Sequence, residues 1–144
     1  MSRSFRTWKR PAALALATAA TVVLAACGSG SSDTAVESGV RVVEPAAAQQ
    51  MLAEEPAPTL IDVRTPQEYA EGHLEGAELV DFNAADFREM IAAYPRDASY
   101  VIYCRSGNRS EGARRIMDEL GFTDVADIDG GILAWTQAGL PLAT

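Results

Sequence analysis

Short apolar runs alternate with helical segments through most of this sequence, and the alternation limits the possible folds more than any other feature. Five runs have the length and composition of buried strands, at residues 40–43, 59–63, 78–80, 99–103 and 124–128. Helical segments follow them, at residues 45–54, 66–71, 83 or 84 to 93, 110–120 and 132–138. We therefore expect an α/β domain with a five-stranded, mostly parallel sheet that helices cover on both faces.

Two residues with polar or reactive side chains stand where predicted strands end. Asp62 closes the run 59–63, and Cys104 directly follows the run 99–103. Because functional sites of parallel sheets lie beyond the carboxyl ends of the strands, both residues should meet at one edge. An acid at the end of a buried strand usually holds a loop through hydrogen bonds, which is the role expected of Asp62.

The loop after Cys104 is suited to stabilising a thiolate. Residues 104–110 read Cys-Arg-Ser-Gly-Asn-Arg-Ser and connect a buried strand to a helix. Backbone N–H groups of such a loop can converge on one point, toward which the positive end of the helix also points. Gly107 permits the backbone twist that this requires. A buried, inert thiol is the alternative for Cys104.

A second helix start lies just after Asp62. Thr65 fits the N-cap, Pro66 the first helical position, and Glu68 completes a capping box. We expect Arg64 and Glu68 to serve as scaffold, with a salt bridge between them that fixes the loop. His73, the only histidine, is expected to be structural, and Trp135 to pack in the core.

The N-terminal part of the chain has a different composition. Residues 3–10 are basic without an acid, and residues 12–26 are uncharged and mostly apolar, which is shorter than the ~20 residues of a membrane-spanning helix. Leu24, Ala25, Ala26 and Cys27 resemble a lipobox, the processing site of bacterial lipoproteins. That resemblance implies a signal peptide over residues 1–26 and acyl chains, such as palmitate, on Cys27. An ordinary signal peptide or an uncleaved anchor helix are the alternatives.

Residues 27–39 are small and polar, which favours a flexible tether between lipidated Cys27 and a domain at residues 40–144. The expected location is the cell envelope, with the domain anchored on the outer side of the cytoplasmic membrane. The sequence contains two cysteines. Lipid on Cys27 would leave Cys104 without a disulfide partner in a compartment where cysteines usually pair. The formal charge of −8 argues against a basic nucleic-acid-binding surface.

Four sequence blocks together resemble a rhodanese domain, in order and spacing: residues 62–69, 72–77, 104–110 and 130–141. The similarity covers about residues 40–142. It implies a rhodanese-like fold and a sulfurtransferase without a cofactor or metal. In such an enzyme the cysteine takes a sulfane sulfur from a donor such as thiosulfate, becomes a persulfide, and passes the sulfur to cyanide or a thiol. The resemblance does not identify the physiological donor and acceptor, or the oligomeric state.

The resemblance gives the loop residues provisional roles. Cys104 is the expected nucleophile, and Arg105 is the candidate for attracting an anionic donor. Arg109 is expected to close the loop by pairing with a carboxylate of Asp62 or Glu68, or else to contact substrate. Three further residues complete the substrate-binding loop, with Ser110 as a hydroxyl donor: Ser106, Asn108 and Ser110.

Two other functions remain alternatives. A phosphatase or arsenate reductase of this fold has five residues between its cysteine and arginine, whereas four separate Cys104 from Arg109, and Ser110 occupies the position of that arginine. The shorter loop encloses less space, which favours a sulfur atom over a tetrahedral oxyanion. A non-enzymatic persulfide carrier or binding module at the cell envelope is the second alternative.

Overall fold

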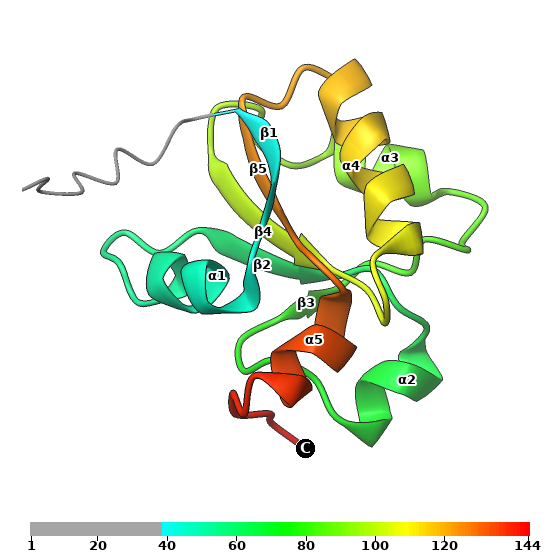
Figure 1. The fold of residues 1–144 in the computed structure, drawn as a ribbon. Helices are drawn as coiled ribbons and strands as arrows, with labels where there is room; N and C mark the ends of the chain where they lie inside the picture. The colour runs from blue at the N-terminus through cyan, green and yellow to red at the C-terminus, as the bar shows by residue number, and fades with distance from the viewer. Residues whose placement is uncertain (1–38) are drawn as a thin grey trace, which may run out of the picture. The chain divides into compact units, whose positions relative to one another are not determined.

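The computed structural model describes residues 39–144, which contain five strands and five helices in strict alternation (Figure 1). The strands are β1 (Val40–Val43), β2 (Thr59–Asp62), β3 (Glu78–Leu79), β4 (Ser99–Tyr103) and β5 (Asp124–Ile128). The helices are α1 (Pro45–Leu52), α2 (Pro66–Glu71), α3 (Phe87–Ala92), α4 (Asn108–Glu119) and α5 (Gly131–Gln137). The predicted signal peptide, tether and lipidated Cys27 lie outside the described residues, apart from Gly39 at the end of the tether.

The strands form one sheet in the order β1-β5-β4-β2-β3, and every pairing in it is parallel. Strand β4 is central, with β2 on one side and β5 on the other. Asp62 pairs in register with Tyr103, and Asp127 pairs with Ile102. The register therefore brings an acidic residue from each neighbouring strand beside the end of β4, where Cys104 begins the loop.

Helices cover both faces of the sheet, as the alternation predicts. Helices α3 and α4 pack on one face, where Phe87 and Met117 contact Ile102 in a buried cluster. Helices α1 and α5 pack on the opposite face, where Met51 and Trp135 belong to a second cluster. Trp135 is thus a core residue, and its Nε1 donates to the carbonyl oxygen of Pro141 at 2.9 Å.

Two predicted helix starts differ from the structure, by three residues and by two residues. The helix expected from residue 84 begins only at Phe87, because the Asp81 carboxylate accepts hydrogen bonds from the backbone and side chain of Asn83 and holds a turn there. The helix expected from Ser110 begins at Asn108, because Gly107 takes a left-handed conformation with φ +100° and provides the start. Among residues 39–144, no helix is both long and apolar enough to cross a membrane.

Candidate active site

Cys104 lies at the carboxyl end of β4, and the first turn of α5 fixes the loop that follows it. The N–H of Ile132 donates to the carbonyl oxygen of Cys104 at 2.9 Å, and that of Leu133 to the carbonyl oxygen of Arg105 at 3.2 Å. Gly131 has φ +59°, and a Cβ there would collide with the Cys104 carbonyl oxygen. The Gly-Gly pair at residues 130–131 thus permits the close approach of two backbone segments.

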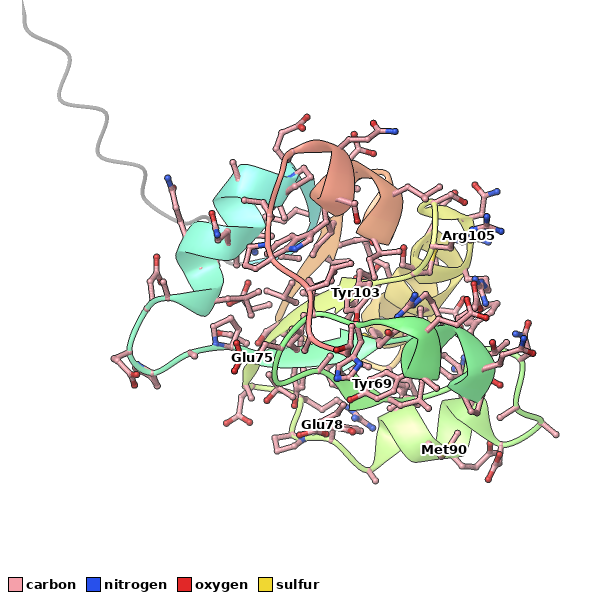
Figure 2. All side chains as sticks on the ribbon, turned by 90° about the horizontal axis from the view of Figure 1, so that it is seen from below. Tyr69, Glu75, Glu78, Met90, Tyr103 and Arg105 are labelled. Atoms are coloured by element: carbon pink, nitrogen blue, oxygen red, sulfur yellow. The ribbon has the colours of Figure 1, made fainter. Side chains whose placement is uncertain are left out.

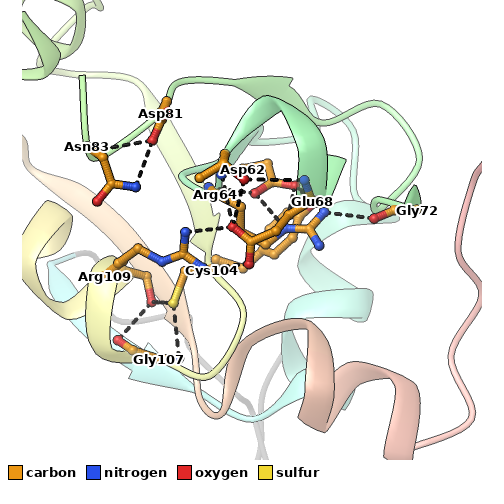
Figure 3. Close-up of polar contacts among 12 residues, drawn as sticks. Asp62, Arg64, Glu68, Gly72, Asp81, Asn83, Cys104, Gly107 and Arg109 are labelled. Carbon is orange, nitrogen blue, oxygen red and sulfur yellow. Dashed lines mark hydrogen bonds and ion pairs between the residues drawn. The ribbon is translucent and has the colours of Figure 1, made fainter. Parts of the chain in front are cut away.

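Because the loop carbonyls point toward α5, the loop N–H groups are free to point inward at the sulfur. The Gly107 N–H donates to Cys104 Sγ at 3.1 Å, and the Ser110 hydroxyl lies 3.5 Å from the same atom (Figure 3). Cys104 is 1% exposed, and Ser110 is fully buried. The cysteine belongs to the buried core beneath α4, but a ring of hydrogen-bond donors from the loop faces its sulfur.

The donors outweigh the effect of burial on the thiol. Burial alone would raise the pKa of Cys104, but hydrogen bonds from the Ser110 hydroxyl and from the N–H groups of Ser110, Ser106 and Gly107 lower it below its usual value. Stabilisation of the anion is what a nucleophilic cysteine needs, and an inert buried thiol would show the opposite shift.

Arg109 closes the loop through a bidentate ion pair with Glu68 (Figure 3). Its two terminal nitrogens lie 2.7 and 2.8 Å from the two carboxylate oxygens. Glu68 is also the third residue of the capping box, since it accepts from the N–H and hydroxyl of Thr65. The pairing with Arg109 lowers the pKa of Glu68 to about 2. The carboxylate thus ties the start of α2 to the start of α4.

Arg64 pairs with Asp62, so the expected salt bridge between Arg64 and Glu68 is wrong. The guanidinium reaches back two residues, with its Nη2 2.6 Å from Oδ2 of Asp62, and also donates to the carbonyl oxygen of Gly72. The Tyr103 hydroxyl donates to the same Oδ2 at 2.7 Å. Glu68 is not available to Arg64 because Arg109 and Thr65 occupy its oxygens.

Tyr103 is a site residue that the sequence analysis missed. Its hydroxyl links Asp62 to the backbone N–H of Leu74, at 2.7 and 3.1 Å, so it joins the loop after β2 to the turn after α2. Burial raises the pKa of the Tyr103 phenol well above its usual value, with Asp62 adding to the shift. Its position in an apolar strand gave no signal that its hydroxyl has this role.

His73 packs in the same turn, in the structural role that we expected for it. Its ring stacks on Tyr69 at 3.8 Å, and its backbone pairs with Ala143 near the end of the chain. Its Nδ1 lies 3.1 Å from the carbonyl oxygen of Tyr69.

The loop presents one cation to solvent. Arg105 is exposed and lies at the outer edge of the molecule, whereas Tyr103 lies in its interior (Figure 2). Arg105 and Arg64 contribute to a pocket of about 330 Å³ whose apolar wall includes Leu133 and Leu142. Ser106 and Asn108 are also exposed on the loop. In residues 39–144, no three His, Cys, Asp or Glu side chains gather in a way that could hold a metal ion.

Residues 44–138 match the model of the rhodanese-like domain family. A sulfurtransferase of Allochromatium vinosum is 35% identical over 103 residues, which are 72% of this chain and 94% of that protein. The thiosulfate sulfurtransferase GlpE of Pseudomonas aeruginosa is 40% identical over 77 residues, or 53% of this chain and 67% of that protein. Both relatives are named as sulfurtransferases.

A larger relative shares only one region with this chain. The probable adenylyltransferase/sulfurtransferase MoeZ of Mycobacterium tuberculosis is 38% identical over 82 residues, which are 57% of this chain and 21% of that protein. The chain therefore spans about one fifth of the length of that relative.

Solved structures agree with the fold. A rhodanese-related protein of Thermoplasma volcanium matches with a TM-score of 0.63 and 29% identity, covering 72% of this chain and 97% of that one. The polysulfide-sulfur transferase homodimer of Wolinella succinogenes matches with a TM-score of 0.60 and 26% identity, covering 71% and 77%.

Proposed function

This chain belongs to the rhodanese-like domain family, and we propose that it moves a sulfane sulfur from an anionic donor such as thiosulfate to cyanide or a thiol through a persulfide on Cys104. The observation that carries the proposal is the ring of donors around Sγ, formed by the Gly107 N–H and the Ser110 hydroxyl. This ring favours an anion on a sulfur that is almost fully buried.

In the first step the Cys104 thiolate attacks the outer sulfur of thiosulfate. The bond between the two thiosulfate sulfurs breaks, and sulfite leaves with its electron pair. Arg105 is the exposed cation beside the loop, and it attracts the dianionic donor. The loop donors favour the thiolate form of Cys104, and attack by a thiolate needs no general base, which agrees with the structural role of His73.

In the second step a cyanide ion or a thiolate attacks the terminal sulfur of the Cys104 persulfide. The sulfur–sulfur bond breaks, the acceptor leaves as thiocyanate or a new persulfide, and the Cys104 thiolate re-forms. Loop N–H groups that stabilise the thiolate also stabilise the persulfide anion, because both are sulfur anions within the same ring. The protein then returns to its starting state without a cofactor.

The position of Arg109 favours sulfur chemistry over phosphate chemistry. Both terminal nitrogens of Arg109 are held by Glu68, so they do not point at a tetrahedral oxyanion above Cys104. Ser110, which occupies the position of the arginine in longer phosphatase loops, is buried and directs its hydroxyl toward the loop interior.

The test combines turnover with intact-mass analysis of the purified full-length protein. With thiosulfate and cyanide we expect thiocyanate release, and with thiosulfate alone a mass increase of one sulfur atom. Cys104→Ser should lose both signals, whereas Cys27→Ser, which changes the only other cysteine of the chain, should keep both. Hydrolysis of a phosphate ester without thiocyanate release would overturn the proposal. A stable sulfur adduct without transfer to any acceptor would favour the persulfide carrier.

We also propose that Cys27 carries lipid and holds the domain on the outer side of the cytoplasmic membrane, at the cell envelope. Support comes from the sequence of residues 1–39 alone: a basic start, a short apolar run, a lipobox-like end and a polar tether. Full-length protein made in cells should sediment with membranes and carry acyl mass, and Cys27→Ser should lose both. Acyl-free wild-type protein in the soluble fraction would contradict this proposal.

A further inference from the structure

Two large apolar side chains stay exposed beside the active-site loop, and the mechanism above does not use them. Leu133 is 45% exposed and Leu142 is 40% exposed. Both line the pocket of about 330 Å³ to which Arg105 contributes. Within residues 39–144 Val42 is the third such side chain, and it lines a different pocket. Single exposed leucines are common on protein surfaces, but a pair on one pocket next to a nucleophile needs an explanation.

The pocket adjoins both ends of the loop that surrounds the Cys104 sulfur. Arg105 follows the cysteine directly, and Glu68, which also lines the pocket, holds Arg109 near the other end of the loop. The N–H of Leu133 donates to the carbonyl oxygen of Arg105 at 3.2 Å. The same turn of α5 therefore fixes the loop with its backbone and supplies one of the two leucines to the pocket.

The second leucine is held in place by backbone contacts on both sides. The carbonyl oxygen of Pro141, just before Leu142, accepts from Trp135 Nε1 at 2.9 Å. Ala143, just after it, exchanges two backbone hydrogen bonds with His73, at 2.8 and 2.9 Å. The apolar wall formed by the two leucines is therefore preorganised, and a ligand that binds there has little backbone to order.

Several polar groups of the pocket are already engaged by the protein. The Arg64 guanidinium is held by Asp62, and the Glu68 carboxylate is held by Arg109. The Thr136 hydroxyl donates to a backbone carbonyl oxygen of α5 at 2.8 Å. The surface that these groups leave for a ligand is largely the apolar wall.

Neither thiosulfate nor cyanide needs an apolar wall. Thiosulfate is a dianion that Arg105 attracts, and cyanide is a small anion, so neither reactant has apolar surface to remove from water. A volume of about 330 Å³ suits a small organic molecule rather than a folded protein. The wall therefore fits the remaining reactant of the cycle, which is the sulfur acceptor.

We propose that the acceptor is a small thiol with an apolar body, which rests on Leu133 and Leu142 while its sulfur reaches the Cys104 persulfide. This inference rests on the proposed function, because it names the acceptor class of that reaction. The acceptor thiolate attacks the terminal sulfur of the persulfide. The sulfur–sulfur bond of the persulfide breaks, its electron pair returns to Cys104 as the thiolate, and the acceptor leaves as a new persulfide.

The test compares neutral thiols of increasing chain length: mercaptoethanol, mercaptopropanol and mercaptohexanol. They are neutral because the exposed charges of Arg105 and Glu71 also line the pocket. Each kcat/KM with the thiosulfate-loaded protein is divided by the rate of the same thiol with a small persulfide in solution, which removes differences in thiol reactivity. Partial burial on a half-exposed wall should raise kcat/KM about twofold per methylene group, and about tenfold from mercaptoethanol to mercaptohexanol.

Replacement of the wall should remove this preference. In the double variant Leu133→Ser with Leu142→Ser, the ratio of kcat/KM between the longest and shortest thiol should fall close to one. The ratio does not depend on the fraction of folded protein, because both thiols react with the same preparation. Val42→Ser, at the exposed apolar residue of the other pocket, should keep the wild-type ratio. A wild-type ratio near one, or an equal ratio in the double variant, would overturn the proposal.

A second measurement needs no sulfur donor and therefore separates this inference from the proposed function. Methyl and hexyl methanethiosulfonate label Cys104 in full-length Cys27→Ser, which lacks the other cysteine. The thiolate attacks the sulfur that carries the alkyl group, methanesulfinate leaves with the electron pair, and a mixed disulfide remains. Relative to a free thiol in solution, the hexyl reagent should react about tenfold faster than the methyl reagent, and the double variant should lose this advantage.

The two measurements together identify which proposal fails. A hexyl preference in a protein that transfers no sulfur would overturn the proposed function and leave the apolar site in place. Sulfur transfer without any chain-length preference would overturn the acceptor class alone.

Discussion

Asp62 and Asp127 lie on the two strands that flank the central strand, but they point to opposite faces of the sheet and their surroundings differ sharply. Both lie on strands that pair with β4, and they are 0% and 3% exposed. Asp62 accepts hydrogen bonds from the backbone and guanidinium of Arg64 and from the Tyr103 hydroxyl. Asp127 has Arg114 at 3.6 Å and an Oδ1 without a partner among residues 39–144.

The difference gives the two acids different roles: Asp62 holds a loop in place, and Asp127 can change its charge. A fully paired buried carboxylate holds its loop in one geometry, which suits the side of the site where Arg64 and Tyr103 join three segments. A poorly paired one can gain or lose a proton at little cost, and its charge then acts on its neighbours. The two strands beside β4 thus carry one fully paired and one poorly paired buried carboxyl, and four predictions test this contrast.

The largest effect is expected from Asp62→Ala. The change leaves the Arg64 guanidinium, whose side chain is 6% exposed, without its counter-charge. Removal of one partner from a buried pair costs about 3–5 kcal/mol. Urea unfolding at neutral pH measures the loss, with Asp127→Asn as the matched control on the other side of β4. A loss below about 1 kcal/mol would show that Asp62 does not hold its loop in place.

Asp127→Asn should stabilise the protein at neutral pH, whereas Asp62→Ala destabilises it, and the effect of Asp127→Asn should depend on pH. The folded pKa of about 6 lies above the usual value of about 3.9, so the folded state binds this proton more tightly than the unfolded state. That contribution to stability is complete below about pH 4 and is lost as pH rises to about 6. The free energy of unfolding of the wild type should therefore fall by about 2–3 kcal/mol relative to the variant across this window. Parallel curves for the two proteins would contradict the raised pKa.

These two acids also show what the sequence could and could not reveal. The order of the strands and helices follows from the alternation of apolar and helical segments, and the strand–loop–helix setting singled out Cys104. The same reasoning that selected Asp62, an acid in an apolar strand, applies equally to Asp127 between Ala126 and Ile128. Asp127 is, like Asp62, the second-to-last residue of its predicted run, so the sequence argument gave no reason to prefer one acid over the other.

The sequence could not determine which carboxylate pairs with which arginine at the site. Arg64 can reach back to Asp62 or forward to Glu68, and both separations are short enough for an ion pair. The choice depends on Arg109, which is 41 residues away from Glu68 and occupies both of its oxygens. Side-chain pairing across such separations follows from the register of β2 and β4, which the pattern of residue types does not encode.

Glu68→Gln should cost less than Asp62→Ala, because the ion pair with Arg109 is about one quarter exposed. The folded pKa of about 2 lies below the usual value of about 4.3, so this carboxylate stabilises the fold above about pH 4 and loses its effect as pH falls toward 2. After allowance for solvent screening we expect a loss of about 1–2 kcal/mol at neutral pH. Glu71→Gln, on the exposed end of the same helix, should change stability by less than about 0.5 kcal/mol.

The comparison between the wild type and Glu68→Gln is made by urea unfolding at several pH values. The advantage of the wild type in free energy of unfolding should shrink as the pH falls toward 2. In the comparison with Asp127→Asn, the wild type should instead lose stability as the pH rises. If the difference in the free energy of unfolding instead grew as the pH falls, the ion pair with Arg109 would not be the cause of the lowered Glu68 pKa.

The smallest effect is expected from Arg88→Ala, which removes an ion pair of good geometry on the surface. Arg88 and Glu119 lie 2.9 Å apart between α3 and α4, but their side chains are 49% and 63% exposed. Such pairs contribute about 0–0.5 kcal/mol because solvent screens the charges and both side chains lose freedom. Urea unfolding in low and high salt measures the effect. A salt-sensitive loss above about 1 kcal/mol would mean that distance rather than burial decides the strength of ion pairs in this fold, and the contrast between Asp62 and Asp127 would then need another cause.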